Sequence, residues 1–381
     1  MTRIRKPDSR PRMGGDGSTA AQTLRLPEPF RLYRGGSLSG AVIAYESWGS
    51  LNERADNAIL LFTGLSPSAH AASNAQNPAD GWWQRMIGPG LAIDTQRYYV
   101  VCVNSLGSCF GSTGPASINP QTGERYRLTF PEIAVEDIAS AGMAAMRSLG
   151  VEQLAAVIGA SLGGMSVLAF ATQFPRAARR LISISGSPAA SPFAIALRSV
   201  QREAIMRDPD WQGGQYDPER PPRSGMRVAR KLGTITYRSA AEWRQRFGRE
   251  TLSGNALSLS PFAPRFAVEA YLESQAERFT RLFDANCYLY LSSAMDRFDL
   301  SEHGGSVAAA LGAVSAERVL VIGVQSDLLF PIDEQAAIAA AFRANGTAVQ
   351  FAPLPSLEGH DAFLVDLARF DPEIRGFLSR P

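Results

Sequence analysis

The chain has 381 residues, and 45% of them are hydrophobic, so most of it can bury a full core and intrinsic disorder is excluded for that part. Its 38 Lys and Arg residues almost balance 36 Asp and Glu residues. The formal charge of +2 creates no general field for nucleic acid or an anionic membrane, so small molecules are the expected partners.

Neither the cysteines nor the N-terminus indicates export. Cys102, Cys109 and Cys287 cannot all pair with one another and have no C-x-x-C spacing, which favours a reducing cytoplasm and disfavours a zinc site. Residues 1–26 are basic, rich in Pro, Gly and Ser, and lack an apolar signal core, so they predict a disordered tail. No run reaches the roughly 18 to 20 apolar residues that cross a bilayer.

Short apolar strands and amphipathic helices then alternate. Residues 31–49 predict a hairpin, and continuous apolar runs predict buried strands. The helix predicted over 130–150 begins with a proline, carries acids in its first turns and ends at a glycine. The remaining ranges are strands at 57–64, 98–105, 154–159 and 179–186 and a helix at 164–175. This βαβαβ order predicts a mostly parallel sheet covered on both faces.

The alternation stops after residue 186. Helical periodicity appears at 192–208, 239–248 and 264–283, separated by polar loops such as 209–225, so residues 187–302 predict a helical lid insertion. Strands at 318–327 and 348–356, with helices from Asp333 and from Asp361, then resume the earlier pattern. The expected catalytic domain therefore comprises residues 27–186 and 303–381.

Ser161 stands in the G-x-S-x-G pattern of Gly159 to Gly163, between a predicted strand and a predicted helix. Glycines two residues before and after a serine allow the sharp turn that exposes a nucleophile at the edge of a sheet. Five residues match easily by chance, and a loop serine that caps a helix is the alternative. The context of strand and helix favours a nucleophile, in an α/β-hydrolase fold.

A serine nucleophile needs a histidine base and an acid, which in this fold follow it in the order acid, then histidine. His360 follows the last predicted strand, whereas His70 precedes Ser161 and His303 lies at the end of the insertion. Asp327 ends an apolar strand and is the expected acid. The alternatives are an N-capping aspartate and a surface histidine. The amides of Leu65 and Leu162 are the expected oxyanion donors.

Several longer sequence motifs along the chain resemble those of the homoserine/serine O-acyltransferase family of α/β-hydrolases. They cover about residues 30 to 380. The most specific are VVCVNSLGSCFGSTGPASINP at 100–120 and YLYLSSAMDRFD at 288–299. The others are AYESWGSLN, LLFTGLS, TFPEIAVEDIA, GASLGGM, ARKLGTITYRS and EGHDAFL.

The resemblance implies Ser161 as acyl-accepting nucleophile, Asp327 as acid and His360 as base. It adds Arg230 as the partner of the substrate carboxylate and Asp361 as the contact for its ammonium. A solvated basic helix face is the alternative for Arg230, and a helix cap is the alternative for Asp361. The family also implies a homodimer formed through the helical insertion, with acyl-CoA as co-substrate and no bound cofactor or metal.

Two stretches resemble the subgroup that succinylates serine rather than the homoserine acetylators. The first is Thr63-Gly64-Leu65-Ser66 before a proline, and the second begins the insertion. A succinyl group ends in a carboxylate, and Arg198 or Arg202 is the expected cation for it. The resemblance therefore implies succinyl transfer from succinyl-CoA to L-serine. The alternatives are a homoserine acyltransferase, a serine esterase or thioesterase, and a non-catalytic binding protein of the same fold.

Overall fold

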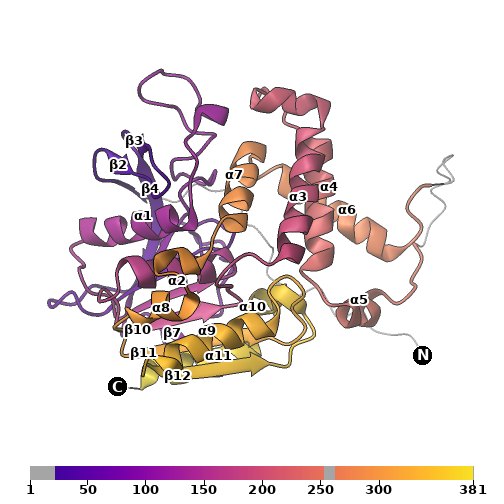
Figure 1. Cartoon of the computed structure of the whole chain (residues 1–381). Helices are drawn as coiled ribbons and strands as arrows, with labels where there is room; N and C mark the ends of the chain where they lie inside the picture. The colour runs from indigo at the N-terminus through magenta and orange to yellow at the C-terminus, as the bar shows by residue number, and fades with distance from the viewer. Residues whose placement is uncertain (1–21, 253–261, 381) are drawn as a thin grey trace.

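The computed structural model of the protein describes residues 22–252 and 262–380 (Figure 1). The prediction of a disordered tail over 1–26 lies outside the described residues as far as residue 21, and it is wrong beyond that point. Residues Gln22–Arg25 form strand β1, which pairs antiparallel with β4, and the following Leu26 is buried. Backbone pairing to the sheet edge orders this segment although its composition is polar.

The centre of the fold is an eight-stranded sheet with the order β1-β4-β8-β5-β9-β10-β11-β12. Strands from β8 to β12 run parallel, whereas β1 and β4 are antiparallel to their neighbours. The sheet strands are β1, β4 (Val42–Trp48), β5 (Ala58–Phe62), β8 (Tyr99–Val103), β9 (Ala156–Ala160), β10 (Arg180–Ile184), β11 (Arg318–Val324) and β12 (Ala348–Leu354). Two small pairs are β2 (Phe30–Arg31) with β3 (Ser37–Leu38), and β6 (Ile87–Gly88) with β7 (Ile93–Asp94).

Helices cover both faces of this sheet, as the alternating pattern predicts. One hydrophobic core lies under α1, α2, α8 and α9, and a second lies under α11 and the segment from Ala69 to Tyr98. The helices are α1 (Val135–Ser148), α2 (Leu162–Gln173), α8 (Val307–Gly312), α9 (Ile332–Ala344), α10 (Ala362–Val365) and α11 (Leu367–Ser379). The mostly parallel sheet with helices on both faces that the sequence predicts is confirmed.

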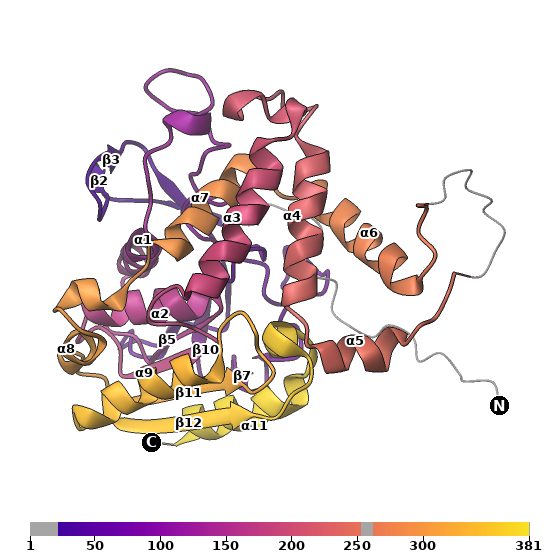
Figure 2. The same cartoon turned by 45° about the vertical axis from the view of Figure 1, so that its right-hand side comes forward.

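Between β10 and α8, five helices of the described residues stand over the carboxyl ends of the strands (Figure 2). They are α3 (Pro192–Met206), α4 (Arg223–Thr236), α5 (Ala240–Phe247), α6 (Ala267–Thr280) and α7 (Ala285–Asp296). The predicted loop 209–225 overlaps the first turn of α4, whose inner face packs between α3 and α6. No helix in the described part of the chain is long and apolar enough to cross a membrane.

Candidate active site

Ser161 occupies a strained turn between β9 and α2. Its backbone has φ 58° and ψ −121°, a conformation that residues other than glycine rarely adopt. A Cβ on Gly159 would lie 2.2 Å from the carbonyl oxygen of Gly163, and a Cβ on Gly163 would lie 2.5 Å from that of Phe62. Glycine is therefore required on both sides of the serine. The turn holds the hydroxyl at the carboxyl edge of the sheet.

Three side chains predicted from different parts of the chain form one hydrogen-bonded series. Nε2 of His360 lies 2.8 Å from Oγ of Ser161, and Nδ1 of His360 lies 2.7 Å from Oδ2 of Asp327. The side chains are almost fully buried, with 8% of Ser161, 3% of His360 and 5% of Asp327 exposed. This arrangement allows the imidazole to remove the serine proton while the carboxylate holds the ring in orientation.

The surroundings fix both partners of the serine. Oδ1 of Asp327 accepts hydrogen bonds from the amides of Leu329 and Phe330, which leaves Oδ2 for the histidine. The His360 ring lies in the short 3-10 helix Gly359–Asp361 and packs 4.9 Å from the ring of Phe330. The alternative of a surface histidine does not fit this buried position.

The other two histidines have carboxylate partners elsewhere. Nδ1 of His70 lies 2.8 Å from Oε2 of Glu46, and Nε2 of His303 lies 2.9 Å from Oε1 of Glu136. Neither joins the series at Ser161. Within residues 22–252 and 262–380, no group of three or more His, Cys, Asp and Glu side chains is arranged to hold a metal ion.

The segment after β5 borders the serine. Leu65 and Ser161 line the same pocket, and a Cβ on Gly64 would lie 3.9 Å from Cβ of Ser161. Leu162 is the first residue of α2, so the helix itself offers no acceptor for its amide. The predicted oxyanion donors thus flank the nucleophile. Thr63 is turned away toward Ser105, and their hydroxyls lie 3.2 Å apart.

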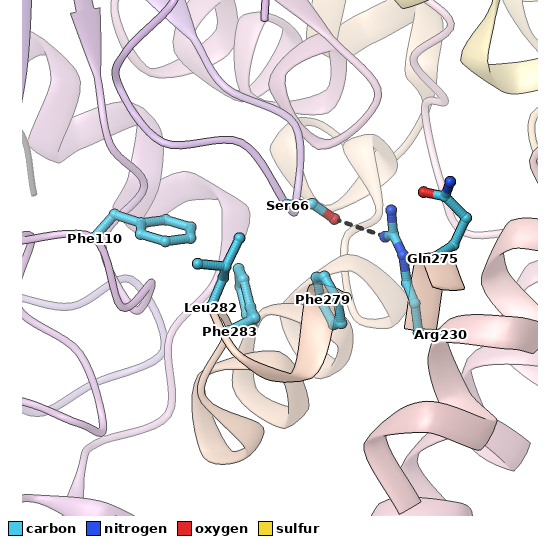
Figure 3. A pocket seen from close by; sticks show the side chains of 7 residues that line it. All are labelled: Ser66, Phe110, Arg230, Gln275, Phe279, Leu282 and Phe283. Atoms are coloured by element: carbon cyan, nitrogen blue, oxygen red, sulfur yellow. Dashed lines mark hydrogen bonds between the residues drawn. The ribbon is translucent and has the colours of Figure 1, made fainter. Parts of the chain in front are cut away.

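Arg230 points inward from α4 into an aromatic pocket beside Ser66 (Figure 3). Its Nη1 donates to Oγ of Ser66 over 3.2 Å, and its guanidinium lies 4.5 Å from the ring centre of Phe279. Only 5% of Arg230 is exposed, so the alternative of a solvated basic face is wrong for this residue. That face belongs to Arg227 and Lys231, which pair with Glu273.

Asp361 is buried beside His360. Its carboxylate is bound by Arg238, a residue that the sequence predictions did not include. Nε of Arg238 donates to Oδ2 of Asp361 over 3.0 Å, and Nη1 of Arg238 donates to Glu358 over 2.8 Å. The Asp361 side chain caps no helix amide. Arg238 lies within the motif ARKLGTITYRS, so the family resemblance was the signal that could have identified it.

The two arginines expected near the acyl group occupy different positions. Arg198 lines the pocket of Ser161 and Leu65, whereas Arg202 is not among the residues that line it. Both contact Asp296: Nε of Arg198 donates to Oδ1, and Nη1 of Arg202 lies 2.6 Å from Oδ2. Asp296 lies in the motif YLYLSSAMDRFD, and the sequence analysis did not predict it as a site residue either.

Comparison with known proteins adds to this geometry. The sequence profile described as alpha/beta hydrolase fold matches residues 57–366. A serine O-succinyltransferase from Litchfieldella anticariensis is 56% identical over 361 residues, which cover 94% of this chain and 98% of that enzyme.

Two solved structures are similar at 28% identity. The homoserine O-acetyltransferase from Bacillus anthracis has a TM-score of 0.87, and the match covers 94% of this chain and 97% of that one. Esterase E22 has a TM-score of 0.85 with 94% and 99% coverage. These matches confirm the resemblance to the homoserine/serine O-acyltransferase family that the sequence motifs indicated. The chain belongs to the serine O-succinyltransferase family of α/β-hydrolase-fold enzymes.

Proposed function

We propose that the protein transfers the succinyl group of succinyl-CoA to the hydroxyl of L-serine and releases CoA and O-succinyl-L-serine, a precursor of cysteine. The observation that carries this proposal is a pocket that combines Ser161 with the guanidinium of Arg198. Both Nη atoms of Arg198 are buried without a hydrogen-bond partner among the residues that the structure describes. A carboxylate-ended acyl group held on Ser161 would supply that partner.

In the first half-reaction, Nε2 of His360 takes the proton of Ser161 Oγ, and Oγ attacks the thioester carbonyl. The amides of Leu65 and Leu162 receive the oxyanion, an interaction for which one donor typically contributes about 10² to 10³ in rate. The C–S bond then breaks, the proton passes from His360 to the sulfur, and CoA leaves. Ser161 retains the succinyl group as an ester.

In the second half-reaction, L-serine occupies the space that CoA leaves. Arg230 binds its carboxylate, and Asp361, oriented by Arg238, binds its ammonium. His360 takes the proton of the substrate hydroxyl, whose oxygen attacks the ester carbonyl. The bond to Ser161 breaks, Oγ recovers the proton from His360, and O-succinyl-L-serine departs.

The helices over the site restrict water, which would otherwise hydrolyse the ester. Tyr237 and Thr236 of the α4 end, Leu197 of α3 and Met295 of α7 line the pocket of Ser161. Helices packed around the pocket in this way would keep bulk water from the acyl-enzyme until the amino acid arrives. This feature favours transfer over simple hydrolysis.

The proposal includes a homodimer in the cytoplasm. Exposed apolar side chains gather on the two long helices α3 and α4, and those at least 45% exposed are Phe193, Val200, Met206, Val228 and Ile235. Such residues favour a contact between copies. Three free cysteines favour a reducing compartment.

The test is a matrix of donors and acceptors. Succinyl-CoA and acetyl-CoA are each combined with L-serine and L-homoserine, and CoA release is followed together with the O-acyl product. The highest kcat/KM is expected for succinyl-CoA with L-serine. A preference for acetyl-CoA with L-homoserine would replace the proposal with the activity in the name of the Bacillus anthracis structure.

Hydrolysis needs a separate measurement because esterase E22 shares the fold. CoA release from succinyl-CoA is measured without an acceptor. A burst of one CoA per active site, followed by slow turnover that L-serine accelerates, is expected. Equal turnover with and without L-serine would identify a thioesterase.

A further inference from the structure

Asp296 joins the end of α7 to one face of α3. Its two partners are Arg198 and Arg202, which lie four residues apart on α3 and therefore share a face of the helix. Nε of Arg198 donates to Oδ1 of Asp296, and Nη1 of Arg202 lies 2.6 Å from Oδ2. One carboxylate thus holds both arginines, one on each oxygen.

The way in which Asp296 binds Arg198 determines which nitrogens of the guanidinium remain available for a ligand. A guanidinium offers an end-on fork through Nη1 and Nη2, which matches the two oxygens of a carboxylate. Asp296 uses Nε and leaves that fork without a hydrogen-bond partner in the described part of the chain. Arg198 is only 4% exposed and lines the pocket of Ser161, so a group that enters this pocket is placed to become the partner of the fork.

Arg202 has a different environment. About a fifth of its side chain is exposed, and Nη1 also donates to Oγ of Ser292 over 2.7 Å. Arg202 contacts Oδ2 of Asp296 and does not line the pocket of Ser161. The two arginines that the sequence left as equal candidates therefore divide into one that faces the acyl group and one that supports the anchor.

The charges of this cluster are not balanced. Asp296 offers one carboxylate to two guanidinium groups, so an anion that enters the pocket would meet an excess of positive charge on this cluster. Glu334 is another carboxyl group near Arg198, and burial raises its pKa. A dicarboxylic acyl group would bring one negative charge and balance the cluster, whereas an acetyl group would not.

We propose that Asp296 is a positioning residue for donor selection: it fixes the Arg198 guanidinium by Nε so that Nη1 and Nη2 receive the terminal carboxylate of the acyl group. Arg202 holds the second oxygen of Asp296 in this arrangement. The inference rests on the proposed succinyl transfer. It assigns the selectivity for a charged donor to a group that does not touch the substrate.

The test compares succinyl-CoA with acetyl-CoA in Asp296→Asn. The amide keeps the shape of the side chain but offers one acceptor and no charge, so Arg198 loses its fixed orientation. We expect kcat/KM for succinyl-CoA to fall about 30-fold, mainly through KM, while kcat/KM for acetyl-CoA changes less than about 3-fold. Asp296→Glu should recover part of the succinyl preference. Arg202→Gln should shift selectivity the same way by a smaller factor.

The matched control is Ser292→Ala, which removes the hydroxyl contact of Arg202 and leaves both contacts of Asp296 in place. It should keep the wild-type donor ratio. The burst of p-nitrophenol from p-nitrophenyl acetate, a neutral ester, reports an intact Ser161 in each variant. If Asp296→Asn does not fold, the ratios of Asp296→Glu and Arg202→Gln decide the question.

The outcomes separate this inference from the proposed function. A wild-type enzyme without succinyl preference would overturn both. A succinyl-selective wild type whose donor ratio is unchanged in all three variants would overturn the role of Asp296 alone. An equal loss with both donors and with the neutral ester would show that Asp296 only supports the fold.

Discussion

Nε2 of His360 lies 2.8 Å from Oγ of Ser161 although 199 residues separate the two in the chain. The serine leaves the sheet in the turn after β9, and the histidine follows β12, so both lie at the carboxyl edge of a parallel sheet. Ligands and reactive groups collect at that edge in α/β folds. The short distance is therefore a consequence of topology as much as of the two side chains.

Two replacements of Ser161 separate its role in catalysis from the backbone strain of its turn. Ser161→Ala and Ser161→Gly both remove the nucleophile, and each should lower transfer by about 10⁴-fold or more. Only glycine accepts φ 58° without cost, so Ser161→Gly should also raise the free energy of unfolding by about 1 kcal/mol, whereas Ser161→Ala should not. CoA release and thermal unfolding measure the two effects. Equal stabilities would mean that the turn is not strained.

Arg230 should affect only the second half-reaction. In Arg230→Lys the fork toward the amino-acid carboxylate is lost, so KM for L-serine should rise about 10- to 100-fold. The burst of CoA from succinyl-CoA alone should keep its amplitude and rate. Arg227→Lys is the matched control, since Arg227 lies on the same helix but pairs with Glu273 at the surface. A slower burst in Arg230→Lys would move this arginine to the donor site.

The order and positions of Ser161, Asp327 and His360 could be predicted because each follows a recognisable apolar strand. Strand ends can be read from local pattern, and parallel strands bring their carboxyl ends together. The same local reading assigned Gln22–Arg25 to the tail, because an edge strand held by pairing has little apolar signal of its own.

The polar partners could not be predicted in the same way. Arg238 and Asp361 are 123 residues apart and meet only because the link between α4 and α5 lies against the His360 turn. Arg198 and Arg202 share one helix face, so their spacing alone gives them equal access to a site. Asp296 on α7 distinguishes them, and its place depends on how two helices of the insertion pack together.

Glycine at position 163 should be important for the stability of the fold as well as for the turn. In Gly163→Ala the new methyl group would lie 2.5 Å from the Phe62 carbonyl oxygen, and backbone cannot move aside easily. The free energy of unfolding should fall by about 3 kcal/mol. Gly376→Ala is the control: its Cβ would meet nothing within 4 Å in α11, and the variant should gain about 0.5 kcal/mol. Denaturant unfolding compares the two, and similar losses would contradict the steric argument.

Asp137 gives the protein a predictable dependence of stability on pH. Its carboxylate accepts hydrogen bonds from the amides of Tyr33 and Ala134 at the start of α1, but burial raises its pKa to about 6. The unfolded chain releases this proton near the ordinary value of 3.8, so between about pH 4 and pH 6 the folded state binds the extra proton.

Stability should therefore fall as pH rises through this window, because the unfolded state gains charge without the cost of burial. The shift of about 2 pH units corresponds to about 3 kcal/mol in the free energy of unfolding. Asp137→Asn has no proton to lose, so the difference between wild type and variant should change by up to that amount between about pH 4 and pH 7. Urea unfolding at a series of pH values measures it. A difference that stays constant, or that moves in favour of the wild type with rising pH, would show that the two amide hydrogen bonds outweigh burial.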